Sequence, residues 1–131
     1  MDISPKASSV VIVVDDDPAV RNSLKFSLEI EGFVVHLYGS GSELLNSHSI
    51  PKASCLVVDQ KMPGMSGLDL IMRLRNQSVQ VPAILITSHP NADITRRAAG
   101  AHVSIVEKPL LGNALIERIR DACARPANGY F

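Results

Sequence analysis

Hydrophobic residues are concentrated in five short runs along the chain. Each run is only a few residues long and is bounded by polar residues, glycine or proline, which is the pattern of a buried β-strand. The first run, VVIVV, is β-branched throughout and predicts a strand covered on both faces, as in a parallel sheet. The predicted strands are Val10–Val14, Phe33–Tyr38, Cys55–Val58, Ala83–Ile86 and Val103–Val106.

Segments with helical signals separate these runs. After Asp17, a good N-cap, Pro18 opens a segment that repeats hydrophobic residues every four positions and stops before Gly32. Ser40 and Ser66 each stand three residues before an acidic side chain, which is the spacing of a capping box. The predicted helices are Pro18–Glu31, the segments after Ser40 and after Ser66, Asn91–Ala99 and Leu111–Ala124.

Alternation of strands and helices predicts βαβ units, whose crossovers are right-handed and whose strands are parallel. The expected fold class is therefore α/β, a doubly wound, five-stranded parallel sheet with five helices on its two faces. Ligands of such sheets bind where the strands end. We expect one rim to collect the polar residues that follow four of the strands, namely Asp15–Asp17, Asp59, Thr87 with Ser88, and Lys108.

Composition fits a single globular domain, with 131 residues of which 46% are hydrophobic and 20% charged. Thirteen basic and thirteen acidic residues balance, so charge predicts no general attraction to nucleic acid or to a membrane surface. No run is long enough to span a membrane, and MDISPKASS lacks the features of a signal peptide, so a cytoplasmic location is the default expectation. We expect a tail at 1–8, the folded domain at 9–124 and a second tail or the start of a linker at 125–131.

The two cysteines predict free thiols. Cys55 lies within a hydrophobic run and Cys123 near the end of the last predicted helix. A disulfide framework or a metal site built on cysteine needs a denser pattern than two residues so far apart.

The acids at the strand ends predict a metal site. Carboxylates crowded at one crevice repel one another and lose solvation unless a cation lies among them. Magnesium suits such a crevice, because it is held by one or two carboxylates while water and phosphate complete its shell. Its charge would draw a phosphoryl donor to Asp59, whose phosphate oxygens Lys108 could pair and the Thr87 hydroxyl could hydrogen-bond.

Four motifs, VVDDDP, VVDQKMPGMSG, LITSH and VEKP, closely resemble those of the response-regulator receiver domain of two-component signalling. The resemblance covers about residues 9 to 124, and the motifs follow consecutive predicted strand ends in the familiar order. A single motif of this kind would be weak, but four in order are specific. The resemblance implies a flavodoxin-like fold with strand order 2-1-3-4-5, which the alternation alone does not decide.

The resemblance also implies roles for individual residues. Asp59 has the position of the phosphoacceptor, Thr87 that of the hydroxyl that turns toward the phosphate, and Lys108 that of the lysine that pairs with it. The bond from Lys108 to Pro109 is cis in the family. The implied ion is magnesium, with manganese as a substitute. Its implied ligands are Asp15 through water, Asp16 directly, Asp59 and the backbone carbonyl of Lys61.

Two further positions bear on signalling. The family usually has Tyr or Phe three residues before the lysine, where this chain has Ile105. A switch that couples Thr87 to an aromatic side chain is therefore not expected, and Thr87, the following loop and the predicted fourth helix would carry the change instead. His89 has a position that influences the phosphate lifetime in the family, although a solvent-exposed loop histidine explains it nearly as well.

The main alternative is an enzyme, an aspartyl-phosphate phosphatase that resembles the haloacid dehalogenases. Asp15 would then be the nucleophile and Asp17 the acid, and Thr87 and Lys108 would imitate the later motifs. Ala19 argues against this alternative because that family has Thr or Val there. A nucleotide-binding module is a weaker alternative, since no glycine-rich loop follows the first strand.

We therefore expect a phosphoacceptor domain, not a turnover enzyme, that takes a phosphoryl group from a sensor histidine kinase or a phosphotransfer protein. The motifs look most like those of transcriptional regulators, but the chain has no basic recognition helix, so we expect no direct binding to nucleic acid. It would be a stand-alone receiver or a fragment that ends near Pro126. A homodimer would use the predicted fourth helix, fifth strand and fifth helix, whose expected surface charges are Arg96, Arg97, Glu117, Arg118 and Asp121.

Overall fold

The computed structural model describes residues 9–124, so the predicted tails at 1–8 and 125–131 lie outside the described residues. Within 9–124, five strands alternate with five α-helices, and a short 3₁₀ helix, η1, precedes the third strand. The elements in chain order are β1 (Val10–Val14), α1 (Pro18–Ile30), β2 (Val34–Tyr38), α2 (Gly41–Leu45), η1 (Ile50–Lys52), β3 (Cys55–Asp59), α3 (Gly67–Asn76), β4 (Ala83–Thr87), α4 (Ala92–Gly100), β5 (Val103–Glu107) and α5 (Ala114–Cys123).

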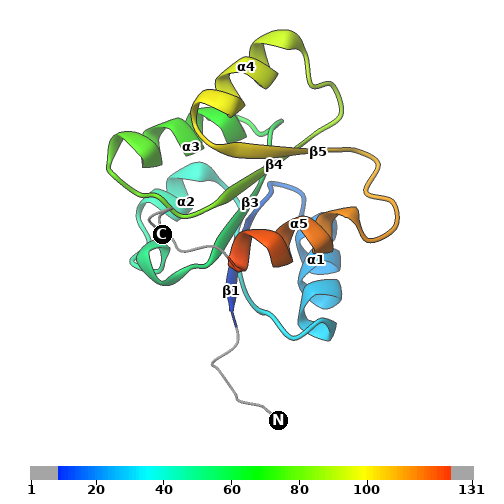
Figure 1. The fold of residues 1–131 in the computed structure, drawn as a ribbon. Helices are drawn as coiled ribbons and strands as arrows, with labels where there is room; N and C mark the ends of the chain where they lie inside the picture. The colour runs from blue at the N-terminus through cyan, green and yellow to red at the C-terminus, as the bar shows by residue number, and fades with distance from the viewer. Residues whose placement is uncertain (1–8, 125–131) are drawn as a thin grey trace.

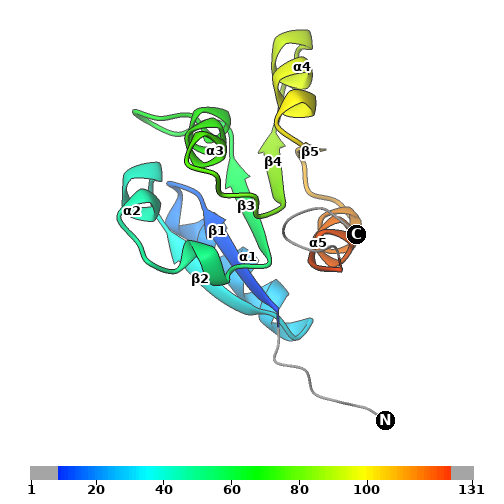
Figure 2. The same cartoon turned by 60° about the vertical axis from the view of Figure 1, so that its left-hand side comes forward.

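The five strands form one parallel sheet in the order β2-β1-β3-β4-β5. Helices α1 and α5 cover one face of the sheet, and α2, α3 and α4 lie on the other (Figure 1). Turned by 60°, the same arrangement shows α4 standing at the end of the molecule beside β5 and β4 (Figure 2). The predicted fold class and strand order are both confirmed.

Two hydrophobic cores, one on each face, hold the layers together. Strands β3 and β4 are buried along their whole length, as expected for strands covered on both faces. The first core joins the sheet to α2 and α3 through side chains such as Leu44 and Leu70. The second joins it to α1 and α5 through side chains such as Leu28 and Ile119.

Local capping explains where the helices begin. The Asp17 carboxylate accepts the backbone N–H of Ala19 at 2.9 Å, which confirms its predicted role as N-cap of α1. Ser40 and Ser66 cap α2 and α3 by accepting the N–H three residues further on, at 3.1 Å in both cases. The predicted capping positions are therefore correct.

The structure differs from the predicted boundaries by one residue at the ends of α1, β2, α4 and β5, and two further differences have a clear physical reason. Asp59 and Thr87 are the last residues of β3 and β4 rather than the first residues after them, because their backbones still pair with Ile86 and Glu107. Helix α5 begins three residues later than predicted, after Gly112 has adopted a positive φ of 64°. That conformation belongs to a turn and is incompatible with the first turn of a helix.

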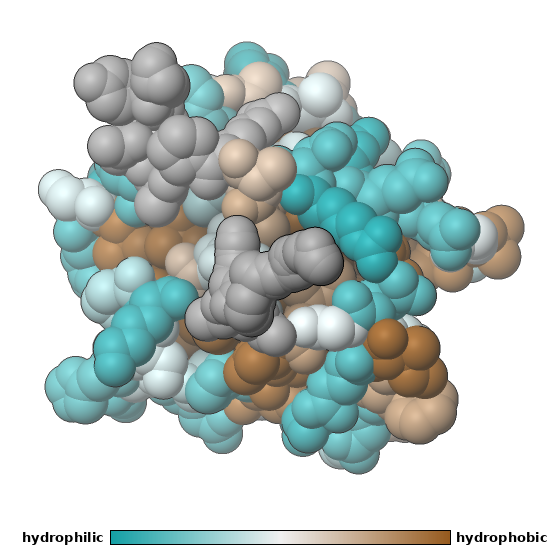
Figure 3. All heavy atoms as spheres, turned by 60° about the horizontal axis from the view of Figure 1, so that its bottom comes forward, coloured by the Kyte–Doolittle hydropathy of each residue, from teal (hydrophilic) through white to brown (hydrophobic). Residues whose placement is uncertain are grey.

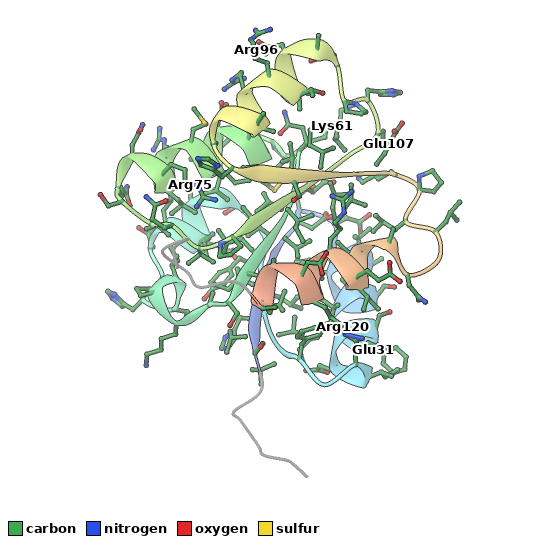
Figure 4. The ribbon with its side chains drawn as sticks, in the orientation of Figure 1. Glu31, Lys61, Arg75, Arg96, Glu107 and Arg120 are labelled. Atoms are coloured by element: carbon green, nitrogen blue, oxygen red, sulfur yellow. The ribbon has the colours of Figure 1, made fainter. Side chains whose placement is uncertain are left out.

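Two arginines tie distant parts of the fold together (Figure 4). The Arg120 guanidinium on α5 pairs with the Glu31 carboxylate at the end of α1. The Arg75 guanidinium on α3 donates to the carbonyls of Val79, Val81 and Ala101 at 2.8 to 2.9 Å. Arg75 thereby joins α3, the loop before β4 and the turn after α4.

In residues 9–124, no helix is long and hydrophobic enough to cross a membrane. The side of the molecule from which β1 starts exposes hydrophobic side chains at several separate places among hydrophilic ones (Figure 3). Cys55 and Cys123 are both free, as predicted.

Candidate functional site

The acidic residues at the ends of β1 and β3 lie together. One carboxylate oxygen from each of Asp15, Asp16 and Asp59 lies within 4.8 Å of the others. Asp15 and Asp59 are almost fully buried, at 4% and 5% exposure, whereas Asp16 is exposed. The predicted carboxylate cluster is therefore formed, with two buried acids and one that faces solvent.

Asp15 is held by contacts on its side chain and its backbone. Its Oδ1 accepts the N–H of Asp17 at 2.9 Å, and its carbonyl oxygen accepts a guanidinium N–H of Arg21 at 2.7 Å. Burial raises the pKa of the Asp15 carboxyl above its ordinary value, the Asp17 N–H opposes that rise, and the negative charge of Asp59 adds to it. A buried carboxylate with another beside it needs positive charge nearby.

Lys108 supplies part of that charge. Its ammonium lies 2.7 Å from Oδ1 of Asp59, and this contact raises the pKa of Lys108. Within residues 9–124 the same oxygen accepts no hydrogen bond of regular geometry, so the ion pair alone holds it. The bond from Lys108 to Pro109 is cis, as the resemblance implied.

One ammonium does not balance three carboxylates. The cluster therefore fits a small divalent cation, because hard oxygen donors from three side chains converge on one point and a buried carboxylate oxygen lacks a regular partner. The donors contain no sulfur or nitrogen, which favours magnesium or manganese over zinc.

Thr87 faces the same space. It is buried, and its Oγ1 accepts the backbone N–H of His89 at 3.3 Å, which leaves the hydroxyl proton free to be donated. A pocket of about 420 Å³ opens over Asp59 and Lys108. It is lined further by Gln60, Lys61, Met62, Ser66, Thr87, Ser88 and His89.

The predicted site residues do not all meet. Thr87, Lys108 and His89 line the pocket with Asp59, and Lys61 lines it from the loop after β3, where Figure 4 labels it. Ile105 does not line the pocket but packs, half-buried, against the first hydrophobic core. It is therefore in place as a core residue of β5.

Three residues of the site neighbourhood were not predicted. Arg21 holds the backbone of Asp15. Gln60 accepts the N–H of Leu68 through its Oε1 at 2.8 Å, and a Cβ on Gly67 would lie 2.4 Å from the Asp59 carbonyl oxygen. Gly67, the last glycine of GMSG, was a visible signal of a close backbone approach. Nothing in the sequence pattern distinguishes Gln60 or Arg21 from surface residues.

Comparison with known proteins identifies the class to which this fold and site belong. Residues 11–120 match the response regulator receiver domain family. This match covers most of the chain, so the chain belongs to that family, which acts in two-component signalling.

Among its relatives is Nodulation protein W of Bradyrhizobium diazoefficiens, 36% identical over 118 residues that make up 89% of this chain and 52% of the relative. The transcriptional regulatory protein FixJ of Rhizobium meliloti is 37% identical over 114 residues, 86% of this chain and 55% of that protein. The chain spans about half the length of these curated relatives.

Solved structures agree with the sequence comparison. The crystal structure of FixJ-N matches with a TM-score of 0.78 at 33% identity, over 90% of this chain and 95% of that one. The response regulator StyR matches with a TM-score of 0.81 at 37% identity, over 89% of this chain and 60% of that one. These results support the receiver interpretation and not the phosphatase alternative with Asp15 as nucleophile.

Proposed function

We propose that Asp59 is the phosphoacceptor of this receiver domain and takes its phosphoryl group from a sensor histidine kinase or a phosphotransfer protein. The observation that carries the proposal is the position of the Asp59 carboxylate. It is buried, lines the pocket, lies beside two further carboxylates and, among residues 9–124, is paired only with Lys108.

The transfer needs few groups beyond these. An Asp59 carboxylate oxygen attacks phosphorus, the bond from phosphorus to the donor's imidazole nitrogen breaks, and the imidazole leaves with that electron pair. Lys108 then pairs with an oxygen of the new acyl phosphate, and the Thr87 hydroxyl donates a hydrogen bond to another phosphate oxygen. Positioning and charge neutralisation are most of what phosphoryl transfer requires.

The residues that would hold a metal ion are Asp15, Asp16, Asp59 and the Lys61 carbonyl. Bound magnesium, or manganese in its place, would neutralise the carboxylates and the incoming phosphoryl group. Asp15 is fixed for this role by the Asp17 N–H and by Arg21, while the exposed Asp16 can reach the ion without moving a buried group.

A response to phosphorylation would begin at Thr87. We infer that rotation of its hydroxyl toward the phosphate releases the His89 N–H and shifts the loop that leads from β4 to α4. Helix α4 can follow this shift because it is weakly anchored, with Ala98 as its buried residue. Ile105 has no aromatic ring that could rotate inward, and its β-branched side chain has restricted χ1 freedom, so its role in β5 is packing. His89, exposed at the pocket rim, would influence how fast water reaches the acyl phosphate.

The same proposal implies a partner surface and a setting. The face of α4, β5 and α5 exposes charges of both signs, including Arg96, which points outward in Figure 4. A homodimer through this face is expected to strengthen on phosphorylation, which sedimentation velocity would measure.

The setting follows from the same proposal. The domain would work in the cytoplasm beside its kinase, within a longer regulator of transcription such as its relatives. It would assist its own phosphorylation without turning over a substrate.

Intact mass spectrometry tests the acceptor. After incubation with magnesium and acetyl phosphate, the wild type should gain one phosphoryl group and Asp59→Asn none. Asp121→Asn, a change of the same kind at an exposed position on α5, is the matched control and should gain the group. Chelation of the metal should abolish the gain. Equal uptake by Asp59→Asn, or no uptake by the wild type, would refute the proposal.

A further inference from the structure

The first turn of α3 is held by the residue that follows the acceptor. The first N–H groups of a helix have no partner within the helix. Here the Gly67 N–H donates to the carbonyl oxygen of Gln60 at 3.0 Å, and the Leu68 N–H donates to its side-chain Oε1 at 2.8 Å. Gln60 thus accepts two of the first three helical N–H groups, and Ser66 accepts the third, from Asp69, at 3.1 Å.

Gln60 is also anchored to the sheet. Its own backbone N–H donates to the carbonyl oxygen of Ile86 on β4 at 2.8 Å. One residue therefore joins the end of β3, the neighbouring strand and the start of α3. The loop at 61–66 leaves from Gln60 and returns to its hydrogen bonds at Gly67 and Leu68.

The start of α3 also touches the acceptor directly. A Cβ built on Gly67 would lie 2.4 Å from the carbonyl oxygen of Asp59 and 2.9 Å from its carbonyl carbon. The glycine therefore lets the helix pack on the peptide of Asp59 itself. Any movement of the first turn of α3 is transmitted to the backbone that carries the acceptor carboxylate.

Leu68 makes the side-chain contact of Gln60 hard to replace. Leu68 is fully buried, so water cannot reach its N–H if the Gln60 oxygen is removed. The loop would have to shift to give that N–H a new acceptor. Lys61, whose carbonyl is the expected metal ligand, is the next residue along and would move with it.

We propose that Gln60 is a positioning residue, which caps α3 through its side-chain oxygen and thereby holds Asp59 and the Lys61 carbonyl in place for the metal ion and for phosphoryl transfer. This inference rests on the proposed function of Asp59. Gln60 acts through the loop and through α3, and it need not touch the phosphoryl group.

Three variants test this role. Gln60→Met keeps the length of the side chain but removes the acceptor, Gln60→Glu keeps an acceptor oxygen, and Gln80→Met makes the first change at an exposed loop position. The measurements are the magnesium dissociation constant by calorimetry, the rate of phosphorylation by acetyl phosphate at saturating magnesium, and hydrogen exchange at the Leu68 amide. All are made far below the unfolding temperature, so that they report on folded protein.

Gln60→Met should weaken magnesium binding about tenfold, as the loss of a partner that orients a metal ligand does. It should also slow phosphorylation and speed exchange at Leu68. Gln60→Glu should restore both the slow exchange at the Leu68 amide and the wild-type rate of phosphorylation. Gln80→Met should match the wild type in every measurement. Unchanged magnesium affinity and rate in Gln60→Met would overturn the proposal, as would a Gln60→Glu variant as impaired as Gln60→Met.

The wild type separates this proposal from the one on which it rests. If the wild type takes up no phosphoryl group, the proposed function of Asp59 fails. Magnesium titration and exchange at Leu68 would still decide whether Gln60 positions the loop.

Discussion

Replacement of Gly67 by alanine is the smallest change that should reach the acceptor from outside the pocket. Gly67 is the first residue of α3 and is buried. An alanine Cβ would lie 2.4 Å from the Asp59 carbonyl oxygen, where ordinary contacts begin at 3.4 Å. It would also lie 2.9 Å from a methyl carbon of Leu85. The clash is with backbone on one side and with the core on the other, so rotation of one side chain cannot relieve it.

The expected losses of stability and of phosphorylation rate follow from that overlap. Either α3 or the end of β3 must move by about 1 Å to restore an ordinary contact. Overpacking of a well-packed core costs about 1–3 kcal/mol of unfolding free energy. A displacement of about 1 Å at a reacting group costs about 100-fold in rate. We therefore expect Gly67→Ala to fold with reduced stability and to accept phosphate about 100-fold more slowly.

Two measurements and one control make the test specific. Chemical denaturation gives the loss of unfolding free energy, and the time course of phosphorylation by acetyl phosphate gives the rate. Gly100→Ala is the matched control, because a Cβ there meets nothing within 4 Å and Gly100 is the last residue of α4. It should leave the phosphorylation rate unchanged and should not destabilise the protein. A wild-type phosphorylation rate in Gly67→Ala would refute the idea that α3 positions Asp59.

Three further changes are predicted to alter stability. Burial raises the pKa of Asp15 above its ordinary value of 3.8, so its ionised form opposes folding at neutral pH, and this cost fades as the pH falls through the folded-state pKa toward 3.8. Without divalent cations, Asp15→Asn should therefore raise the thermal unfolding midpoint at neutral pH and lose that advantage in acid; a lower midpoint at neutral pH would count against the reasoning. Arg75→Met should lower the unfolding free energy by about 2–3 kcal/mol, because three carbonyls lose a charged donor in a half-buried place; urea denaturation measures this, and a loss below about 0.5 kcal/mol would contradict it. His102→Gly should stabilise the fold by about 0.5–1 kcal/mol, because His102 has a φ of 59° at an exposed turn that suits glycine; the same denaturation experiment would disprove this if the variant were less stable.

Much of the architecture could be predicted because it depends on neighbours along the chain. A run of β-branched residues forms a strand wherever both of its faces are covered, and the capping contacts of Asp17, Ser40 and Ser66 span only two or three residues. The acids could be assigned to one rim because parallel strands all end on the same side of a sheet. The strand order came from the resemblance to a family, since alternation alone is compatible with several orders.

The boundaries and some partners could not be predicted in this way. Asp59 and Thr87 continue their strands only because Ile86 and Glu107 lie beside them in the sheet. Arg75 and Ala101 are 26 residues apart in the sequence, so their contact leaves no local pattern. The contact between the Asp69 carboxylate on α3 and the Arg97 guanidinium on α4, at 3.2 Å, is unpredictable from local sequence for the same reason.

The sequence by itself determined which residues form strands and helices, and which carboxylates stand at the strand ends, because periodicity and capping act over a few residues. Only the tertiary structure decided that Gln60 caps α3, that Gly67 packs on the acceptor peptide and that the Arg75 guanidinium reaches the Ala101 carbonyl. Those contacts join segments whose separation depends on how the whole chain packs. A side chain's partner across such a distance is a property of the folded molecule and of no single stretch of its sequence.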